Sequence, residues 1–210
     1  MKNNFSILAW FVVLYFVLKY FVPFWNYVIY PVSLIVTFLH EFWHAFFALI
    51  TWGQVHWIHI NTNWSWYTIT SGWIQSLILM WGYIGSAIFW NILLYLWFKK
   101  PEQSKYIIYF LAGLMFFVAF YWFNNFVTSL ILFVIWTILF LVSNDEKLDA
   151  LILQLLWVFS ILYIIQDFAV GPSSDLAKFS TILPKFVWMI IWLLIVLIIT
   201  WWNLKNIFRK

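Results

Sequence analysis

Long apolar runs alternate with short polar stretches along the whole of this 210-residue chain. Each run contains about 20 residues, which is the length an α-helix needs to cross the roughly 30 Å hydrocarbon core of a bilayer. The pattern predicts an all-α polytopic membrane protein with about seven transmembrane helices, the fourth and fifth of them separated near Asn124 and Asn125. The expected spans cover residues 5–24, 25–52, 73–98, two segments within 106–142, 148–170 and 184–203.

Residues 54–72 break this pattern because the segment is too short and too polar to span a membrane, although it contains no Lys, Arg, Asp or Glu. Two runs rich in β-branched and aromatic residues flank the turn-forming residues 61–63, which predicts a short β-hairpin after the second span. The tryptophans suit the membrane interface, so the hairpin is expected to anchor the chain there or to offer an edge strand to an extended peptide. We therefore expect a single membrane domain over 1–210, with the hairpin (53–72) as an insertion and no soluble domain.

Composition supports the membrane interpretation and excludes several other classes. The chain is 66% hydrophobic and 9% charged, with a mean hydropathy of +0.95, and a soluble domain of this size cannot bury so much apolar surface. The net charge of +4 is spread over loop edges, so no nucleic-acid partner is expected. The absence of cysteine excludes disulfides, thiolate nucleophiles and cysteine-ligated zinc. The first apolar run lacks a small-residue cleavage site, which favours a retained helix. The expected location is a bacterial-type cell membrane, with the chain as a multi-pass integral protein.

The second span contains the motif H-E-x-x-H, formed by His40, Glu41 and His44. On a helix the two histidines lie one turn apart on the same face, where they can share a metal ion, and Glu41 lies beside that ion. In zinc hydrolases the two imidazoles bind Zn²⁺, which lowers the pKa of a water to about 7, and the glutamate takes the proton. Polar groups of this kind are costly inside a membrane and therefore mark a functional site. The motif predicts one zinc ion per chain.

The third zinc ligand is sought by elimination. A third histidine six residues after His44 would be typical of one class, but Ile50 occupies that position, and no glutamate follows Glu41 before Glu102. With seven spans, four other acidic residues fall on the opposite membrane face, which leaves four candidates: His56, His59, Asp167 and Asp175.

Asp175 is preferred over Asp167 because the motif histidines lie below the membrane surface, whereas Asp167 is a turn from the end of its own helix. Gly171-Pro172 lets the chain turn back before Asp175, and irregular backbone is tolerated at membrane depth where it lines a polar cavity. Asp167 is kept as the alternative third ligand, or as an acceptor that orients a ligand imidazole.

The third span contains small residues at helical spacing. Gly82 and Ser86 are four residues apart, which predicts a face on which two helix backbones approach closely, and Asn91 is expected to donate a hydrogen bond across that contact.

Several stretches together resemble the M50 membrane metalloproteases, the site-2 protease class, and specifically their M50B-like branch. The helix 31–53 with its H-E-x-x-H core is similar to the motif helix of that class, and the charge-free hairpin follows it directly. Residues 81–87 resemble the G-Y-x-G-x-A segment of this branch, and 174–179 ahead of Pro184 resemble its S-D-A-x-x-L segment. The resemblance implies zinc-dependent hydrolysis of peptide bonds in or near the membrane, with two histidines and one aspartate as ligands. The chain departs from the wider class in lacking the L-D-G form of the aspartate motif.

These observations favour a zinc intramembrane endopeptidase acting on transmembrane or membrane-proximal peptides, with the hairpin 54–72 as the candidate substrate-binding segment. Glu41 is expected to activate the water and later to protonate the leaving amine. Two alternatives stay open: a non-catalytic membrane protein of the same fold that binds partner helices, and a membrane zinc hydrolase with a non-peptide substrate. The intact Glu41 speaks against the first, because a binding protein needs no base at that position.

The orientation in the membrane is predicted differently by two arguments. Seven spans place most basic residues on one face, and the positive-inside rule then puts the C-terminus in the cytoplasm and the hairpin outside. That basic face comprises Lys19, Lys99, Lys100, Lys105, Lys147, Lys205, Arg209 and Lys210, against Lys2, Lys178 and Lys185 on the other. The family resemblance favours a site that opens toward the cytoplasm. We take the charge count, because it uses the chain's own residues.

Overall fold

The fold is described from a computed structural model of the chain. The structure describes residues 2–25, 29–60, 66–72, 74–122, 126–143, 145–167, 175, 178 and 184–208. Most of these residues are helical, as the sequence predicts.

The helices are α1 (Lys2–Phe21), α3 (Tyr30–Ile50), α4 (Gln75–Lys99), α5 (Ser104–Tyr121), α6 (Phe126–Val142), α7 (Glu146–Asp167) and α9 (Lys185–Phe208), with a short 3₁₀ turn, η1 (Pro101–Gln103), before α5. Within the described residues, five of them, α3, α4, α5, α7 and α9, are long and apolar enough to cross a membrane. The apolar segments of α1 and α6, Ser6–Phe21 and Phe126–Val142, are shorter. The sequence predicts about seven transmembrane helices; the described residues form five candidate spans and two shorter apolar helices.

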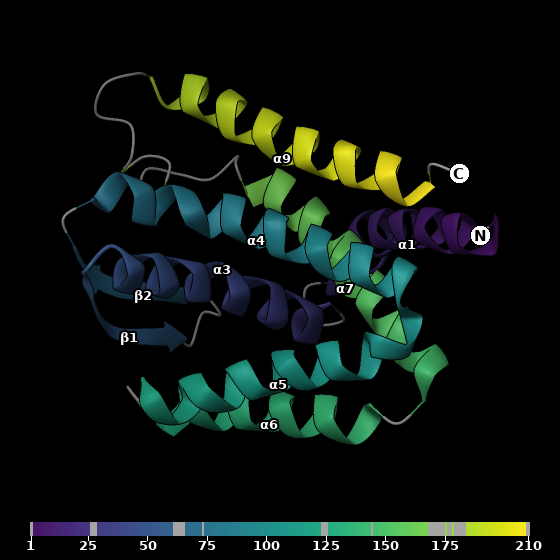
Figure 1. Ribbon diagram of the computed structural model, residues 1–210, viewed down its shortest axis with the longest axis horizontal. Helices are drawn as coiled ribbons and strands as arrows, with labels where there is room; N and C mark the ends of the chain where they lie inside the picture. Colours follow the sequence, from purple (N-terminus) through teal and green to yellow (C-terminus); the bar gives the residue numbers. More distant parts are fainter. Residues whose placement is uncertain are drawn as a thin grey trace.

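Helices α3 and α4 form the centre of the molecule (Figure 1). Helix α9 packs on one side of α4, α7 contacts α3, α4 and α5, and the pair α5 and α6 lies on the side of α3 away from α9. Helix α4 is apolar around its whole circumference and is the most buried of the candidate spans, as expected for a helix with neighbours on several sides.

The predicted hairpin is present. Strands β1 (Gln54–Ile60) and β2 (Trp66–Ser71) pair antiparallel, with an irregularity between Val55 and Trp57, and both pack against α3. The side chains of β2 alternate between more and less buried, so that Trp66, Thr68 and Thr70 form the inner face. The predicted turn, residues 61–63, lies outside the described residues.

Helix α1 begins at the end of the molecule where α9 ends, and it runs in the same direction as α3 (Figure 1). Seven successive crossings would instead place the start of α1 and the end of α9 at opposite ends of the molecule. The expected grouping of Lys19 with Lys99 is therefore wrong, because α1 starts at the end of the molecule that contains Lys99 rather than finishing there.

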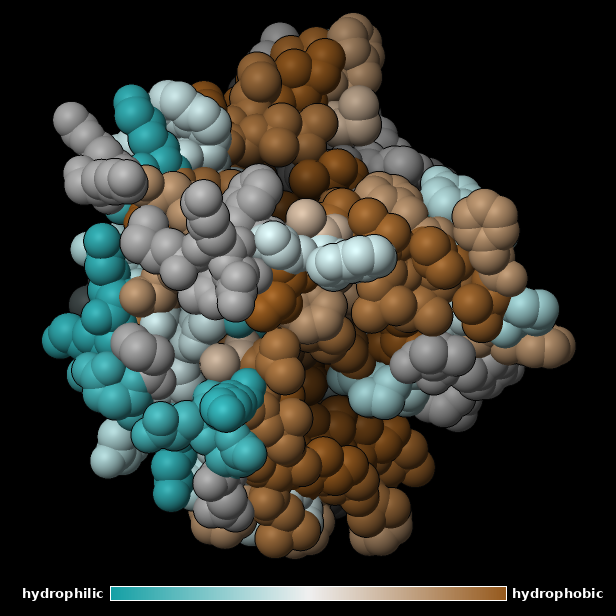
Figure 2. Space-filling model, turned by 90° about the vertical axis from the view of Figure 1, so that its right-hand side faces the viewer, coloured by the Kyte–Doolittle hydropathy of each residue, from teal (hydrophilic) through white to brown (hydrophobic). Residues whose placement is uncertain are grey.

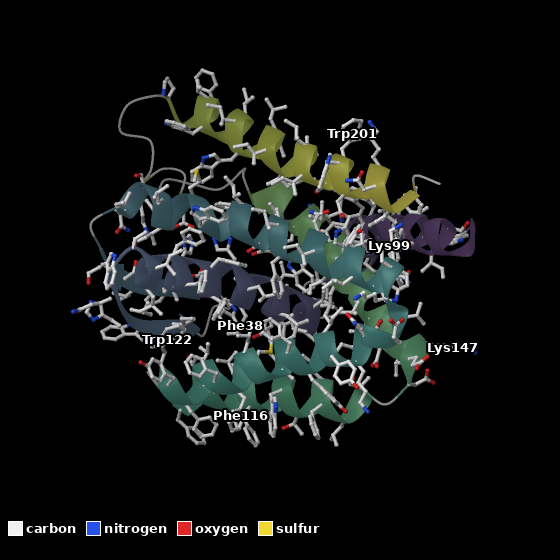
Figure 3. All side chains as sticks on the ribbon, viewed as in Figure 1. Phe38, Lys99, Phe116, Trp122, Lys147 and Trp201 are labelled. Carbon is white, nitrogen blue, oxygen red and sulfur yellow. The ribbon has the colours of Figure 1, made fainter. Side chains whose placement is uncertain are left out.

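The end of the molecule that contains Lys99 is rich in lysine. Lys99 is the last residue of α4 and Lys147 lies in the first turn of α7, so both are at this end of the molecule (Figure 3). Lys105 lies in the first turn of α5 and Lys205 in the last turn of α9, at the same end. Figure 2 views this end directly: hydrophilic side chains gather on its left-hand side, and apolar side chains cover much of the rest. Such a charged edge is typical of a membrane surface.

Candidate metal centre

Helix α3 holds His40 and His44 on its buried face. Pro31 lies in the first turn, where its missing N–H costs no hydrogen bond, and no Gly or Pro interrupts the helix before it ends at Ile50. The two rings lie 4.7 Å apart, centre to centre, and both residues are at least nine-tenths buried. The local sequence therefore produces the paired arrangement, and the packing of α3 against α4 shields it from solvent.

Three candidate ligand atoms converge at this point. The Nε2 atoms of His40 and His44 are 3.1 Å apart, and Oδ2 of Asp175 lies 3.2 Å from the first and 3.0 Å from the second. Zinc bonds to nitrogen and oxygen of about 2.0–2.1 Å give tetrahedral ligand–ligand distances of about 3.3 Å. The three atoms thus form a triangle of nearly the size that one tetrahedral zinc ion requires.

The orientation of the His44 ring is set by the backbone of α4. Its Nδ1–H donates to the carbonyl oxygen of Ile78 over 2.7 Å. A proton at Nδ1 leaves the lone pair of Nε2 free, and Nε2 is the atom that faces Asp175. The backbone of α4 thus selects the tautomer of His44 that can bind a metal.

Gly82 lies directly against both imidazoles. A Cβ atom added at this glycine would overlap the His44 ring and would lie 2.7 Å from Cε1 of His40. The sequence predicts that Gly82 lets two backbones approach, whereas in the structure it makes room for two rings.

Asn91 does bond across a helix contact, donating to Oγ1 of Thr200 in α9 over 3.2 Å, as expected for that residue.

Asp175 reaches this centre from the chain between α7 and α9, and its side chain is 21% exposed. Burial by itself favours the neutral carboxyl, but His44 and His40 outweigh that effect, so the pKa of Asp175 lies below its ordinary value.

Among the described side chains, the candidates His56 and His59 are not part of this group. Asp167 is the last residue of α7, and its side chain lies outside the described residues. His56 and His59 are both on β1: Nε2 of His56 is 3.4 Å from Oγ of Ser71, and His59 packs against Tyr67. Among the described residues, the group with metal-ligand geometry consists of His40, His44 and Asp175.

Glu41 lies next to this group and is held by the hairpin. Oγ1 of Thr68 is 2.7 Å from Oε2 of Glu41 and 3.0 Å from its carbonyl oxygen. Thr68 is not recognisable as a site residue from the sequence, because nothing in the spacing of two residues 27 positions apart indicates that β2 folds back onto α3. The only available signal is the alternation that places Thr68 on the inner face of β2.

Comparison with known proteins yields one match. No curated protein and no solved structure matches the chain. The family described as Peptidase M50B-like matches residues 7–203, which is nearly the whole chain and includes every residue of the candidate centre. The match agrees with the resemblance carried by the H-E-x-x-H helix and by the segments around Gly82 and Asp175. This chain therefore belongs to the Peptidase M50B-like family, a family of membrane peptidases.

Proposed function

We propose that this protein is a zinc-dependent intramembrane endopeptidase in which His40, His44 and Asp175 bind one Zn²⁺ and Glu41 is the general base. The observation that carries the proposal is the convergence of two imidazole nitrogens and one carboxylate oxygen, all within 4.8 Å of one another, beside a buried glutamate. Two neutral imidazoles and a carboxylate are an ordinary donor set for catalytic zinc, which keeps a fourth position for water or substrate.

The chemistry divides between the metal and the chain. Zinc, when bound, polarises the scissile carbonyl and makes a water more acidic. The carboxylate of Glu41 takes the proton from the attacking water and delivers it to the amine that leaves. Burial of Glu41 among α3 and the hairpin limits bulk water around the carboxylate, which keeps its interaction with the reacting atoms strong.

The substrate is proposed to be a peptide segment within or close to the bilayer. The centre is set in a helix that is a candidate membrane span, and strands β1 and β2 pack against the same helix. Among the described residues the sheet has two strands, so each strand has one edge that pairs with no other strand, and an extended peptide can add to such an edge through main-chain hydrogen bonds. Cleavage requires an extended backbone, because a peptide bond inside a helix is enclosed by its own hydrogen bonds.

The test compares wild-type protein with Glu41→Gln in proteoliposomes that contain a synthetic single-span peptide with a central Asn-Gly-Pro break. Glutamine keeps the shape of the side chain but cannot accept the proton, so zinc content should be unchanged and cleavage, followed by mass spectrometry, should be lost. Equal cleavage by both proteins would contradict the role of Glu41. A zinc-loaded wild type that cleaves no peptide but hydrolyses another membrane amide would support a non-peptide substrate instead.

A further inference from the structure

We propose that Thr68 is a positioning residue for the Glu41 carboxylate, so that the hairpin is part of the catalytic machinery as well as a candidate substrate-binding segment. This inference rests on the proposed function of Glu41. It is carried by the short contact between the half-buried Thr68 hydroxyl and the buried carboxylate of Glu41.

The Thr68 hydroxyl has one proton and two acceptors within reach. Oε2 of Glu41 is 2.7 Å away and the carbonyl oxygen of the same residue is 3.0 Å away. A hydrogen bond to an ionised oxygen is about twice as strong as one to a neutral oxygen, so the proton goes to the carboxylate. The contact therefore fixes one oxygen of Glu41 and leaves the other to accept the proton of water.

Thr68 is itself held in place by the sheet. It pairs with Ile58 of β1, whose side chain is completely buried, and its neighbours Tyr67 and Ile69 point to the exposed side. Among the described residues, Thr68 is the one side chain that forms a hydrogen bond with Glu41. The carboxylate of Glu41 is thus held by a residue of the hairpin, although Glu41 itself lies on α3.

A contact that merely fastened the hairpin to α3 would need only the carbonyl oxygen of Glu41, which lies 3.0 Å from the Thr68 hydroxyl, yet the hydroxyl lies closer to the carboxylate oxygen, at 2.7 Å. Since the hydroxyl lies closer to Oε2, a displacement of β2 during peptide addition to the hairpin would also displace the base. The structure thereby links the segment proposed to receive the substrate with the group proposed to activate water.

The activity test uses Thr68→Val, which keeps the shape and removes the donor, and Thr68→Ser, which keeps the donor. In the proteoliposome assay we expect Thr68→Val to lower kcat by about 10- to 100-fold, as for a lost hydrogen bond to a charged group, with KM changed by less than about twofold. Zinc content should be unchanged, and Thr68→Ser should retain most of the activity. Thr137→Val is the matched control, because its hydroxyl bonds to the carbonyl oxygen of Phe133 on the exposed face of α6.

A wild-type kcat in Thr68→Val would overturn the proposal while leaving the proposed function intact. If Thr68→Val does not fold, Thr68→Ala and Thr68→Ser replace it, because both lose the methyl group and differ in the hydroxyl. Equal kcat values for this pair would likewise overturn the positioning role.

An infrared measurement tests the contact without any substrate. The chain contains three glutamates, Glu41, Glu102 and Glu146, so ¹³C-carboxyl labelling of glutamate and subtraction of the Glu41→Gln spectrum isolates the Glu41 band. Thr68→Val should shift this carboxylate band, and Thr68→Ser and Thr137→Val should leave it in place. A band that does not move in Thr68→Val would refute the contact even if all proteins cleave; a shifted band in proteins that cleave nothing would keep the contact and refute the proposed function.

Discussion

Replacing Gly82 with alanine tests whether the close approach of α4 to the two imidazoles is required for the metal centre. The added methyl carbon would overlap the His44 ring and lie 2.7 Å from Cε1 of His40, whereas non-bonded carbons normally lie about 3.5–4.0 Å apart. The rings or the α4 backbone must therefore move by roughly 1 Å, against a tolerance of about 0.2 Å for metal–ligand distances. We expect zinc affinity to fall by at least about 10- to 100-fold, the loss typical when support for a ligand is removed.

Two further glycines provide matched controls. A Cβ atom added at Gly113 in α5 would meet open space, so Gly113→Ala should change only the helix propensity. This change should raise the free energy of unfolding by about 1 kcal/mol. Gly85 lies on α4 against the Trp43 ring, and a Cβ atom added there would be 2.7 Å from Cδ2 of Trp43. Gly85→Ala therefore disturbs the contact between α3 and α4 without touching an imidazole. Overpacking there should lower the free energy of unfolding by about 1–3 kcal/mol, and the free energy of zinc binding should change by less.

The assay is chelator-competition titration of zinc in detergent, with thermal unfolding of the metal-free proteins measured in parallel. Gly82→Ala should lose more zinc affinity than Gly85→Ala. Wild-type zinc affinity in Gly82→Ala, or the same loss in both α4 variants, would refute the conclusion that Gly82 acts through the imidazoles.

Three other predictions concern the ligands and the orientation. His40→Ala or His44→Ala should abolish zinc binding measured by metal analysis, and wild-type protein unable to take up zinc would contradict the site. Asp175→Ala should lower bound zinc while Asp167→Ala retains it, because Asp175 lies within 3.2 Å of both imidazoles; the reverse result would exchange their roles. A reporter fused after the last residue should be cytoplasmic, because lysines gather at the end of the molecule where α9 ends, and an external reporter would contradict the charge argument.

The hairpin and the helix containing H-E-x-x-H were predictable because both depend on residues that are close together in the sequence. β-Branched and aromatic runs on either side of turn-forming residues predict the two strands, and the spacing of four residues puts His40 and His44 on one helix face whatever surrounds them. The number of crossings was less predictable. The length and composition of an apolar run do not show whether its helix crosses the membrane, or in which direction. Helix α6 and the described apolar part of α1 are shorter than a span, and α1 runs parallel to α3.

The sequence by itself determined a membrane protein with a paired-histidine helix, since hydropathy and helical spacing are properties of neighbouring residues. It narrowed the carboxylate candidates to Asp167 and Asp175 and favoured Asp175, but it could not show that either side chain contacts the histidines. Only the tertiary structure decided that Asp175, 135 positions from His40, reaches the imidazoles. It also decided that Gly82 makes room for the rings and that Thr68 bonds to Glu41. These contacts depend on how α3, α4 and the hairpin pack, and an apolar pattern around all sides of α4 does not specify which of its faces meets α3.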